Sequence, residues 1–336
     1  MRKGWNGIAL LVVFALALAG CGSSNNSAGG SASEAGQQNT GSAQTENAAG
    51  PITVTDDRGE VKLDKPAERV VVLEWTFTED VIALGVQPVG NADNENYKVY
   101  VTSEAALDSN VTDVGARNEP NLETIASLKP DLIISDKRSH EAIHDQLKAI
   151  APTLEFDTYK GGYDHDHMVS IFNTIATALG KEDKAKEVLA DLDQHYADAK
   201  EKLAAAGKSD FHYVLTQAFT YQNAASLRMF TDNSVVSSTL AKIGLINDWQ
   251  PEKLEDYGFT TVGIEALSDV QDSNFIYITQ PDDDVFGEGV KDNSVWNGLN
   301  FVKENRTYPI ASTTWTFGGP LSSKVLVDEV VGAITK

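Results

Sequence analysis

Residues 168–206, MVSIFNTIATALGKEDKAKEVLADLDQHYADAKEKLAAA, decide how this chain folds. The stretch contains no proline and a single glycine, Gly180. Apolar side chains recur at helical spacing on both sides of this glycine, with Glu, Asp and Lys on the opposite face. We therefore expect two helices, the first ended by Gly180 and the second by Gly207. The second would have about 24 residues and a length of about 36 Å. A helix of that length can connect two lobes, although a surface helix on a single domain fits the same periodicity.

The bulk composition restricts the possible partners. The chain has 336 residues, enough for about two domains, and a formal net charge of -22. So acidic a protein does not attract nucleic acid or an anionic membrane surface. The single cysteine, Cys21, excludes a disulfide framework and a cysteine-based metal site. The folded part must therefore depend on an apolar core, which this length allows.

The N-terminal fifty residues are expected to lie outside the fold. Residues 1–20 have the basic start and short apolar run of a signal peptide. The run ends in Leu18-Ala19-Gly20-Cys21, which resembles the lipobox of bacterial lipoproteins and makes Cys21 the expected lipidation site; a plain secretory signal is the alternative. Residues 21–50 are rich in Ser, Asn and Gly, as in a disordered tether. We therefore expect a protein held by its lipid at the extracytoplasmic face of the cell membrane.

Strands alternate with helices before and after the long helix. Expected strands are 52–55, 61–63, 69–73, 86–89, 132–135, 153–156, 211–215, 275–279 and 307–310. Expected helices outside the central stretch are 79–84 with Thr78 as its cap, 121–129, 139–150, 235–243, 285–291 and 321–334, and residues 90–107 are an expected loop.

This alternation predicts an α/β fold with two doubly wound α/β lobes bridged by one long helix. The expected parts are an N-terminal lobe, 51–181, an inter-lobe helix, 182–206, and a C-terminal lobe, 207–336. We expect two separately folded halves with a ligand site between them, at the carboxyl ends of strands.

Signatures of catalysis and of metal binding are weak. The chain lacks a Gly-x-Ser-x-Gly elbow, a Walker loop and a Gly-x-Gly-x-x-Gly turn after a strand. We therefore expect a binding protein and not an enzyme, with an extracellular hydrolase as an alternative. The pairs His140 with His144 and His165 with His167 have spacings that can hold a metal, but a third ligand is not evident. A direct zinc or manganese receptor remains the closer alternative.

Arginines and aromatic residues near predicted strand ends are the candidate ligand-binding residues. A guanidinium group is permanently charged and binds oxygen anions through two N–H groups, while flat rings form the walls of pockets for bulky ligands. The candidates are Trp75, Tyr97, Arg117, Arg138, Arg228, Trp315 and Phe317. The alternatives are surface salt bridges for the arginines and core packing for the rings. Gly318-Gly319-Pro320 begins the last helix, where backbone N–H groups can bind an anion or simply form a turn.

Three segments resemble the periplasmic-binding-protein family for ferric siderophores and vitamin B12, and the likeness extends from Pro51 to Lys336. They are RVVVL (69–73), DVIALGVQPVG (80–90) and PNLETIASLKPDLII (120–134). LGKE (179–182) and WTFGGPLS (315–322) are similar to the subgroup for iron siderophores and ferric citrate.

The resemblance implies a receptor that binds a ferric siderophore, of carboxylate or hydroxamate–citrate type and including ferric citrate, and delivers it to an ABC importer. Haem or cobalamin are alternative ligands. It implies docking to the permease through Glu123 and Glu265, and ligand binding near Arg117 and Arg138. In the second lobe, Arg228 and Arg306 are the main basic candidates. We further expect a monomer without a cofactor, in which the siderophore and not the protein coordinates iron. A stiff connecting helix predicts limited lobe closure.

Overall fold

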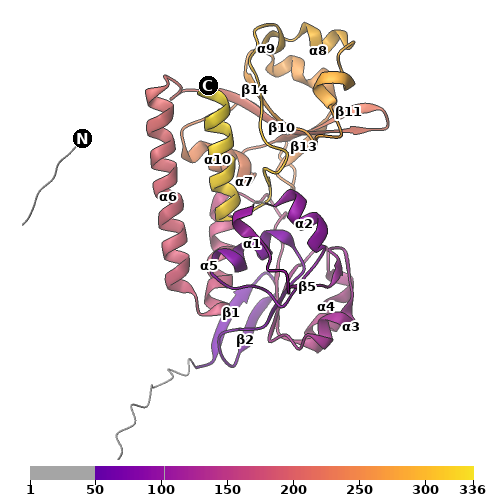
Figure 1. Ribbon diagram of the computed structural model, residues 1–336, viewed down its shortest axis with the longest axis vertical. Coiled ribbons are helices and arrows are strands. Elements are labelled where there is room, and N and C mark those ends of the chain that lie inside the picture. The colour runs from indigo at the N-terminus through magenta and orange to yellow at the C-terminus, as the bar shows by residue number, and fades with distance from the viewer. Residues whose placement is uncertain (1–49, 102) are drawn as a thin grey trace, which may run out of the picture. The chain divides into compact units, whose positions relative to one another are not determined.

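The computed structural model describes residues 50–101 and 103–336. The expected signal peptide, Cys21 and nearly all of the expected tether lie outside these residues. The described body is an α/β structure with two main sheets, one drawn in indigo to magenta and one in orange tones (Figure 1).

The sheet of the N-terminal lobe has five parallel strands in the order β5-β4-β3-β8-β9. The apolar run at 69–73 forms β3 at its centre, and every residue of β3 and β8 is buried, as expected when helices cover both faces. The strands are β3 (Val70–Val72), β4 (Gly90–Asn91), β5 (Thr112–Asp113), β8 (Leu132–Asp136) and β9 (Thr153–Phe156). The helices are α1 (Trp75–Ala83), α2 (Asn94–Tyr100), α3 (Leu122–Ser127) and α4 (His144–Ile150), with short 3-10 helices η1 (Ser103–Ala105) and η2 (Glu141–Ile143).

Two small hairpins flank this lobe. The first is formed by β1 (Ile52–Asp56) and β2 (Gly59–Leu63), which contain the predicted strands 52–55 and 61–63. The second, β6 (Gly115–Ala116) with β7 (Glu119–Pro120), places Arg117 in its turn.

The sheet of the C-terminal lobe is mixed. Its order is β13-β11-β10-β14-β15, with β12 beside β10, and only β11 runs antiparallel to its neighbours. The strands are β10 (His212–Tyr221), β11 (Ala224–Phe230), β12 (Ile246–Asn247), β13 (Phe259–Val262), β14 (Asn274–Ile278) and β15 (Thr307–Pro309). The helices are α7 (Val235–Lys242), α8 (Ser294–Gly298) and α9 (Asn300–Lys303), with the 3-10 helix η3 (Ile264–Val270) and the π-helix η4 (Val285–Gly289).

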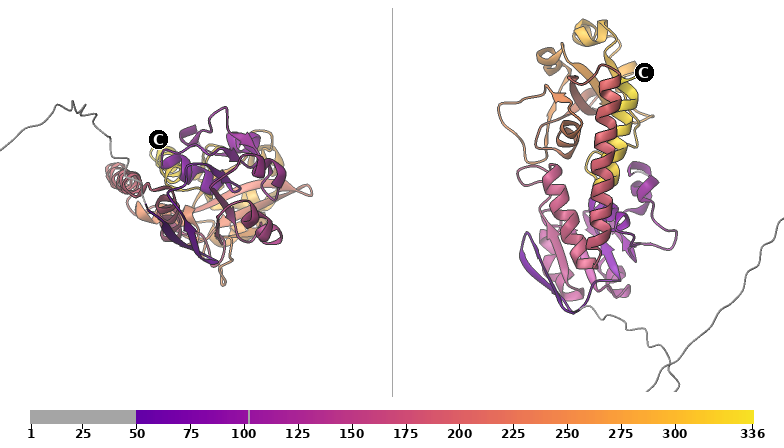
Figure 2. Two further views of the ribbon diagram at one scale, coloured as in Figure 1. Left: turned by 90° about the horizontal axis from the view of Figure 1, so that it is seen from below. Right: turned by 90° about the vertical axis from the view of Figure 1, so that its left-hand side faces the viewer.

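Three helices run along the lobes as a layer: α5 (His165–Leu179), α6 (Glu182–Ala205) and α10 (Pro320–Ile334) (Figures 1 and 2). Gly180 ends α5 in the left-handed conformation, with φ 62°, and α6 has the expected 24 residues. Packing joins α6 to α5 and α10, and α10 also contacts α1 and α7.

The expectation of two separately folded halves is wrong for the core. One apolar cluster continues from Val70 and Val72 in the N-terminal lobe to Leu215 and Phe230 in the C-terminal lobe, through the faces of α5, α6 and α10. The physical reason is that α10, although last in sequence, packs on α1 as well as on α6. The predicted α/β fold, with two lobes bridged by the long helix α6, is confirmed. The helices α5 and α10 add a helical layer to that bridge, and through it the two lobes share one core.

Several local predictions are corrected by the structure. The first helix begins at Trp75, and its cap is Glu74, whose carboxylate accepts the Trp75 N–H at 2.9 Å, not Thr78. The expected loop at 90–107 contains α2, and the strand expected at 86–89 is β4 at Gly90–Asn91. The hairpin of β10 and β11 was missed; its turn is Gln222-Asn223, both with positive φ, as this type of two-residue turn requires.

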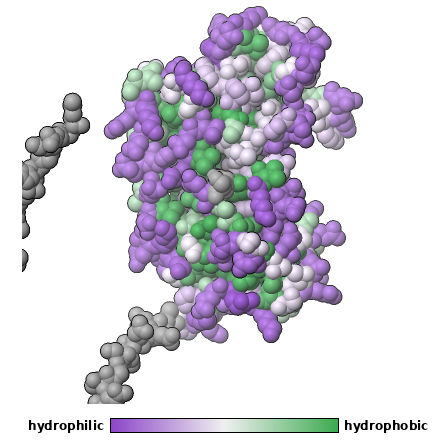
Figure 3. All heavy atoms as spheres, viewed as in Figure 1, coloured by the Kyte–Doolittle hydropathy of each residue, from purple (hydrophilic) through white to green (hydrophobic). Residues whose placement is uncertain are grey.

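The surface agrees with this layering. In the view of Figure 3, hydrophilic residues predominate along the edge formed by α6, whereas hydrophobic residues show near the middle of the same face. No helix in the described part of the chain combines the length and the apolar character needed to span a membrane.

Candidate ligand-binding site

A cavity of about 620 Å³ lies where the two lobes face each other. Its wall contains eight aromatic residues, two arginines and one carboxylate. The residues that line it are Trp75, Asp93, Asn96, Tyr100, Arg117, Tyr159, Gln217, Ala218, Phe219, Arg228, Tyr257, Phe259, Ile278, Thr279, Gln280, Trp315 and Phe317. We call this cavity the inter-lobe cleft. It brings together five of the seven predicted ligand-binding residues: Trp75, Arg117, Arg228, Trp315 and Phe317.

On the N-terminal side, Arg117 stacks on Trp75. The guanidinium carbon is 3.8 Å from the centre of the indole ring, a favourable cation–π arrangement. Arg117 Nη1 is also 2.9 Å from Glu74 Oε1, and Glu74 is buried. Burial raises the pKa of the Glu74 carboxyl, and the Arg117 guanidinium opposes that shift. The backbone of the Arg117 turn is held by His140, whose Nε2 donates to the Arg117 carbonyl at 2.6 Å.

On the C-terminal side, Arg228 comes from within β11 and not from beyond a strand end. Its guanidinium carbon lies 5.1 Å from the Phe219 ring and 5.3 Å from the Phe259 ring, and its Nη1 donates to Gln217 Oε1 at 3.2 Å. Burial lowers the pKa of Arg228, but guanidinium remains charged in proteins. In the part of the chain that the structure describes, no carboxylate lies within ion-pairing distance of Arg228.

The segment before α10 supplies the third wall. Trp315 lies 5.5 Å from Trp75 across the lobes, and Phe317 lies 6.0 Å from Phe259, measured between ring centres. Thr76 in α1 donates from its hydroxyl to the Phe317 carbonyl at 2.6 Å. The cleft wall is therefore tied to both lobes.

Tyr97 is a correction. It is only 1% exposed, its hydroxyl donates to the Ala105 carbonyl at 2.7 Å, and it meets the far side of Trp75 edge-on. Tyr97 is therefore absent from the lining of the cleft. Tyr100, three residues on and stacked on Trp75, lines the cleft instead. The unrecognised helix α2 explains the error, because the helical turn directs Tyr97 inward and Tyr100 outward.

Arg138 is also placed differently from the prediction. It lies outside the lining of the cleft and pairs with Asp157 at 3.3 Å and with Asp256 at 3.5 Å. Because Asp256 belongs to the C-terminal lobe, Arg138 bridges the two lobes. Arg306 has a local role as well, donating to the carbonyls of Asp272 and Ser273.

Several residues of the cleft were not predicted from the sequence, chiefly Asp93, Tyr100, Tyr159, Phe219, Tyr257 and Phe259. Tyr159 and Tyr257 lie outside the predicted helices and strands, so their position was a usable signal. Phe219 and Phe259 lie in β10 and β13 beyond the strands that the sequence indicated, and nothing in the local pattern marked them.

The two predicted docking glutamates are exposed. Glu123 lies in the first turn of α3, which Asn121 caps by accepting the Thr124 N–H at 2.9 Å. Glu265 lies in the first turn of η3. Both side chains are accessible to a partner. A carboxylate in the first turn of a helix also interacts favourably with the helix dipole, so these positions agree with a capping role as well as with docking.

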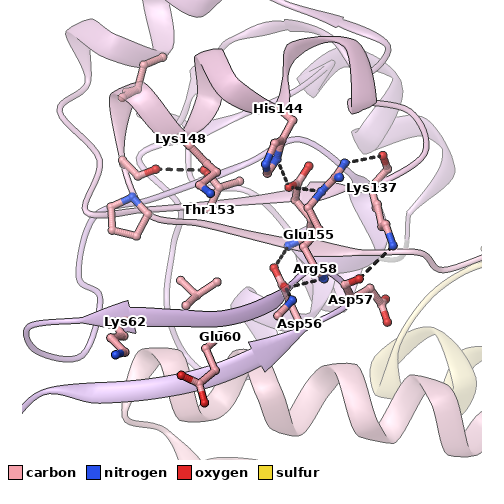
Figure 4. Close-up of a pocket in the computed structure, with 15 residues that line it drawn as sticks. Asp56, Asp57, Arg58, Glu60, Lys62, Lys137, His144, Lys148, Thr153 and Glu155 are labelled. Carbon is pink, nitrogen blue, oxygen red and sulfur yellow. Dashed lines mark hydrogen bonds and ion pairs between the residues drawn. The ribbon is translucent and has the colours of Figure 1, made fainter.

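A second hollow, of about 820 Å³, lies between the β1–β2 hairpin and the residues of α4 and β9 (Figure 4). Buried Glu155 of β9 is contacted there by Arg58 Nε at 2.6 Å and by His144 Nδ1, while Arg58 Nη2 pairs with Glu141 at 2.6 Å. The buried Glu155 carboxylate is already paired with Arg58 and His144, which are partly exposed. This hollow therefore joins the hairpin to the lobe, and we do not assign it a ligand.

The histidines are dispersed among such contacts. His140 supports the Arg117 turn, and His144 pairs with Glu155. Within residues 50–101 and 103–336, no group of three or more His, Cys, Asp or Glu side chains is arranged to hold a metal ion.

The chain is similar to proteins of known family. A family model described as periplasmic binding protein matches residues 70–314. The Fe(3+)-citrate-binding protein YfmC of Bacillus subtilis is 32% identical over 325 residues, which cover 96% of this chain and 95% of that protein. The probable siderophore-binding lipoprotein YfiY of the same organism is 29% identical, with 96% of both chains covered.

A solved structure shows the same likeness. The siderophore-binding protein FhuD from Vibrio cholerae, bound to Fe3+ and Desferal, matches with a TM-score of 0.71 and 28% identity, covering 80% of this chain and 98% of that one. The match of one family model over most of the chain, together with a relative of almost equal length, settles the assignment: this chain belongs to the periplasmic binding protein family.

Proposed function

We propose that this protein is the extracytoplasmic receptor of an ABC importer for iron, and that it captures a ferric siderophore or a related ferric chelate in the inter-lobe cleft. The observation that carries the proposal is the convergence of Arg117 and Trp75 from one lobe with Arg228 and Phe259 from the other on one cavity. Relatives whose names state Fe(3+)-citrate or siderophore binding support it.

The cleft suits a chelate that brings its own iron. Its wall combines aromatic rings for a bulky ligand with guanidinium groups for oxygen atoms. The siderophore supplies the iron ligands, and the protein recognises the outside of the complex without coordinating the metal. No bond is made or broken in this role, so the protein acts as a receptor and not as an enzyme.

Two further parts of the proposal concern location and delivery. Cys21 carries a lipid that anchors the protein to the membrane, and residues 22–50 connect the anchor to the folded body. The protein acts as a monomer and docks to the permease through Glu123 and Glu265. The cross-lobe contacts of Arg138 with Asp256 and of Thr76 with Phe317 favour a small closure on binding.

Quenching of tryptophan fluorescence tests the proposal, since Trp75 and Trp315 line the cleft. Ferric chelates of hydroxamate, citrate and catecholate type, with haem and cobalamin, are titrated into the mature protein. We expect tight binding of at least one ferric chelate and a loss of about tenfold or more in Arg228→Gln, as for a charge-assisted contact. Lys202→Gln, on the exposed side of α6, is the control and should bind as the wild type does.

The other outcomes decide against the proposal. Binding of haem or cobalamin in preference to all ferric siderophores would assign the cleft to those ligands. A stabilisation by free Zn2+ or Mn2+ without chelator would favour a direct metal receptor. Separately, Cys21→Ala should release the protein from the membrane fraction if Cys21 is the lipidation site.

A further inference from the structure

The positive charges near the inter-lobe cleft are mostly neutralised within the protein. Arg117 contacts buried Glu74 at 2.9 Å. Arg138, outside the lining of the cleft, contacts both Asp157 and Asp256. Only Arg228, among the described arginines near the cleft, has amide and aromatic neighbours without a carboxylate partner.

A carboxylate on the opposite lobe offsets Arg228. Asp93 lines the cleft from the residue before α2, with φ 55°, and its two oxygens accept the Asn96 amide at 2.9 and 3.1 Å. Within the described residues, no lysine or arginine lies within ion-pairing distance of Asp93. The charged groups in the wall and directly behind it therefore sum to a charge near zero: Arg117 with buried Glu74 behind it, and Arg228 with Asp93.

We infer that the cleft selects ferric chelates whose net charge is near zero, and that Glu74 and Asp93 are the residues that discriminate against polyanionic chelates. This inference rests on the proposed function. A polyanion would meet one unpaired guanidinium and one carboxylate, and the burial of its uncompensated charge between aromatic walls would cost free energy.

The charge requirement points to a chemical class of chelate. Three hydroxamate groups, each with one negative charge, cancel the charge of Fe3+ and leave a neutral complex with an apolar outer surface. Citrate and catecholate groups leave excess negative charge on their ferric complexes. A trihydroxamate therefore fits the aromatic walls and the near-neutral wall charge, with its iron-bound oxygens at Arg228.

A series of probes that differ in charge tests this. Ferrioxamine B carries a pendant ammonium group and a net positive charge, ferrioxamine E is neutral, and ferric dicitrate is a polyanion. Dissociation constants are measured by tryptophan quenching for the wild type, Glu74→Gln, Asp93→Asn and the double variant. Gln keeps an acceptor for the Trp75 N–H, and Asn tolerates the left-handed backbone of residue 93. Glu201→Gln and Asp198→Asn, on the exposed face of α6, are matched controls for charge.

We expect the wild type to bind ferrioxamine E at least about tenfold more tightly than ferric dicitrate, and the double variant to reduce this ratio by about tenfold. The control variants should keep the wild-type ratio. Equal or tighter binding of ferric dicitrate by the wild type would overturn the inference and leave the proposed function intact. An unchanged ratio in the double variant would remove Glu74 and Asp93 as the discriminating residues. If no ferric chelate of any charge binds, the proposed function fails, and the inference fails with it.

Discussion

Glu79 in α1 accepts two hydrogen bonds from Ser322 in α10, from the backbone N–H at 2.8 Å and from the hydroxyl at 2.5 Å. The two residues are 243 positions apart in sequence, and both are buried. The N-terminus of a helix favours a carboxylate, because its first N–H groups lack partners within the helix. The anion that the Gly318-Gly319-Pro320 turn binds is thus a side chain of the protein itself, and this contact fixes the start of α10 against α1.

Gly318→Ala tests how closely the contact between α1 and α10 is packed. A methyl group at residue 318 would overlap Ser322 and the Glu79 carboxylate. We expect the free energy of unfolding to fall by about 1–3 kcal/mol, as for other overpacked sites. Ligand affinity should fall too, because Trp315 and Phe317 lie just before this turn. Urea denaturation and tryptophan quenching measure the two effects.

Gly332→Ala in the same helix is the matched control. Residue 332 is exposed, and a methyl group there meets no atom within 4 Å. Since alanine is the better helix former, this variant should be as stable as the wild type or more stable by up to about 1 kcal/mol. Equal stability of Gly318→Ala and the wild type would show that the α1–α10 contact is more adaptable than its geometry implies.

Asp80 gives a second prediction, for pH dependence. It is buried beside Glu79, and within residues 50–101 and 103–336 neither of its carboxylate oxygens has a hydrogen-bond partner. Burial, with the neighbouring charge of Glu79, raises the pKa of Asp80 well above its ordinary value. At pH values between the unfolded pKa and the raised folded pKa, Asp80 keeps its proton in the folded protein, whereas the unfolded chain has released it. This contribution to stability is complete below the unfolded pKa of about 4 and is lost as pH rises through the folded pKa.

We expect the free energy of unfolding to decrease from pH 4 upward more steeply in the wild type than in Asp80→Asn, by up to about 1.4 kcal/mol per pH unit for one proton. Denaturation at a series of pH values measures the difference, with Asp198→Asn on exposed α6 as the control. Parallel pH profiles for the wild type and Asp80→Asn would mean that Asp80 is ionised in the folded state.

The parts of the fold that the sequence could predict are those in which one local signal determines the structure. The stripe that includes Leu192, Tyr196, Ala199 and Leu203 is buried along α6, and the left-handed Gly180 separates α5 from α6. The apolar run at 69–73 forms a central parallel strand for the same reason. Errors occurred where a long-range contact decides: Glu74 caps α1 while it binds Arg117, and α10 joins α1 to complete one core.

The cleft shows the same division. Two signals in the sequence identified Trp75, Arg117, Arg228 and Trp315 as candidates: the small number of arginines in an acidic chain, and the position of tryptophans in loops. All four residues line the cavity. Tyr97 and Arg138 had the same local features, yet one is buried behind Trp75 and the other pairs with Asp157 and Asp256. The tertiary arrangement decides which side of α2 faces the cleft and which acid pairs with which arginine. The pattern of residues along the sequence does not contain this information.

The Arg58–Glu155 pair is predicted to stabilise the N-terminal lobe without affecting binding. Glu155 has a fully buried side chain, and Arg58 contacts it at 2.6 Å. Arg58→Ala leaves a buried carboxylate with His144 as its remaining partner, which should cost about 3 kcal/mol or more in the free energy of unfolding. Ligand affinity at a temperature where the variant is folded should match the wild type, because Arg58 does not line the cleft.

Glu141→Ala separates the buried pair from the exposed one. Glu141 contacts the same Arg58, but its side chain is 68% exposed. Exposed ion pairs contribute little to stability, so this variant should unfold near the wild-type denaturant midpoint. A loss as large as that in Arg58→Ala would mean that the Arg58–Glu141 contact, and not the burial of Glu155, holds the hairpin.

Glu123 and Glu265 allow delivery to be tested apart from capture. Both are exposed, in the first turns of α3 and η3, and neither lines the cleft. We expect Glu123→Ala with Glu265→Ala to reduce uptake of a radiolabelled ferric chelate by cells about tenfold or more, while the purified variant binds the chelate as the wild type does. Charged contacts on an exposed surface favour association with an oppositely charged partner, which is why loss of two carboxylates should act on docking. Glu201→Ala on α6 is the control and should support normal uptake. Weaker chelate binding, or a lower unfolding midpoint, in the double variant would instead assign the two glutamates to the stability of their helices.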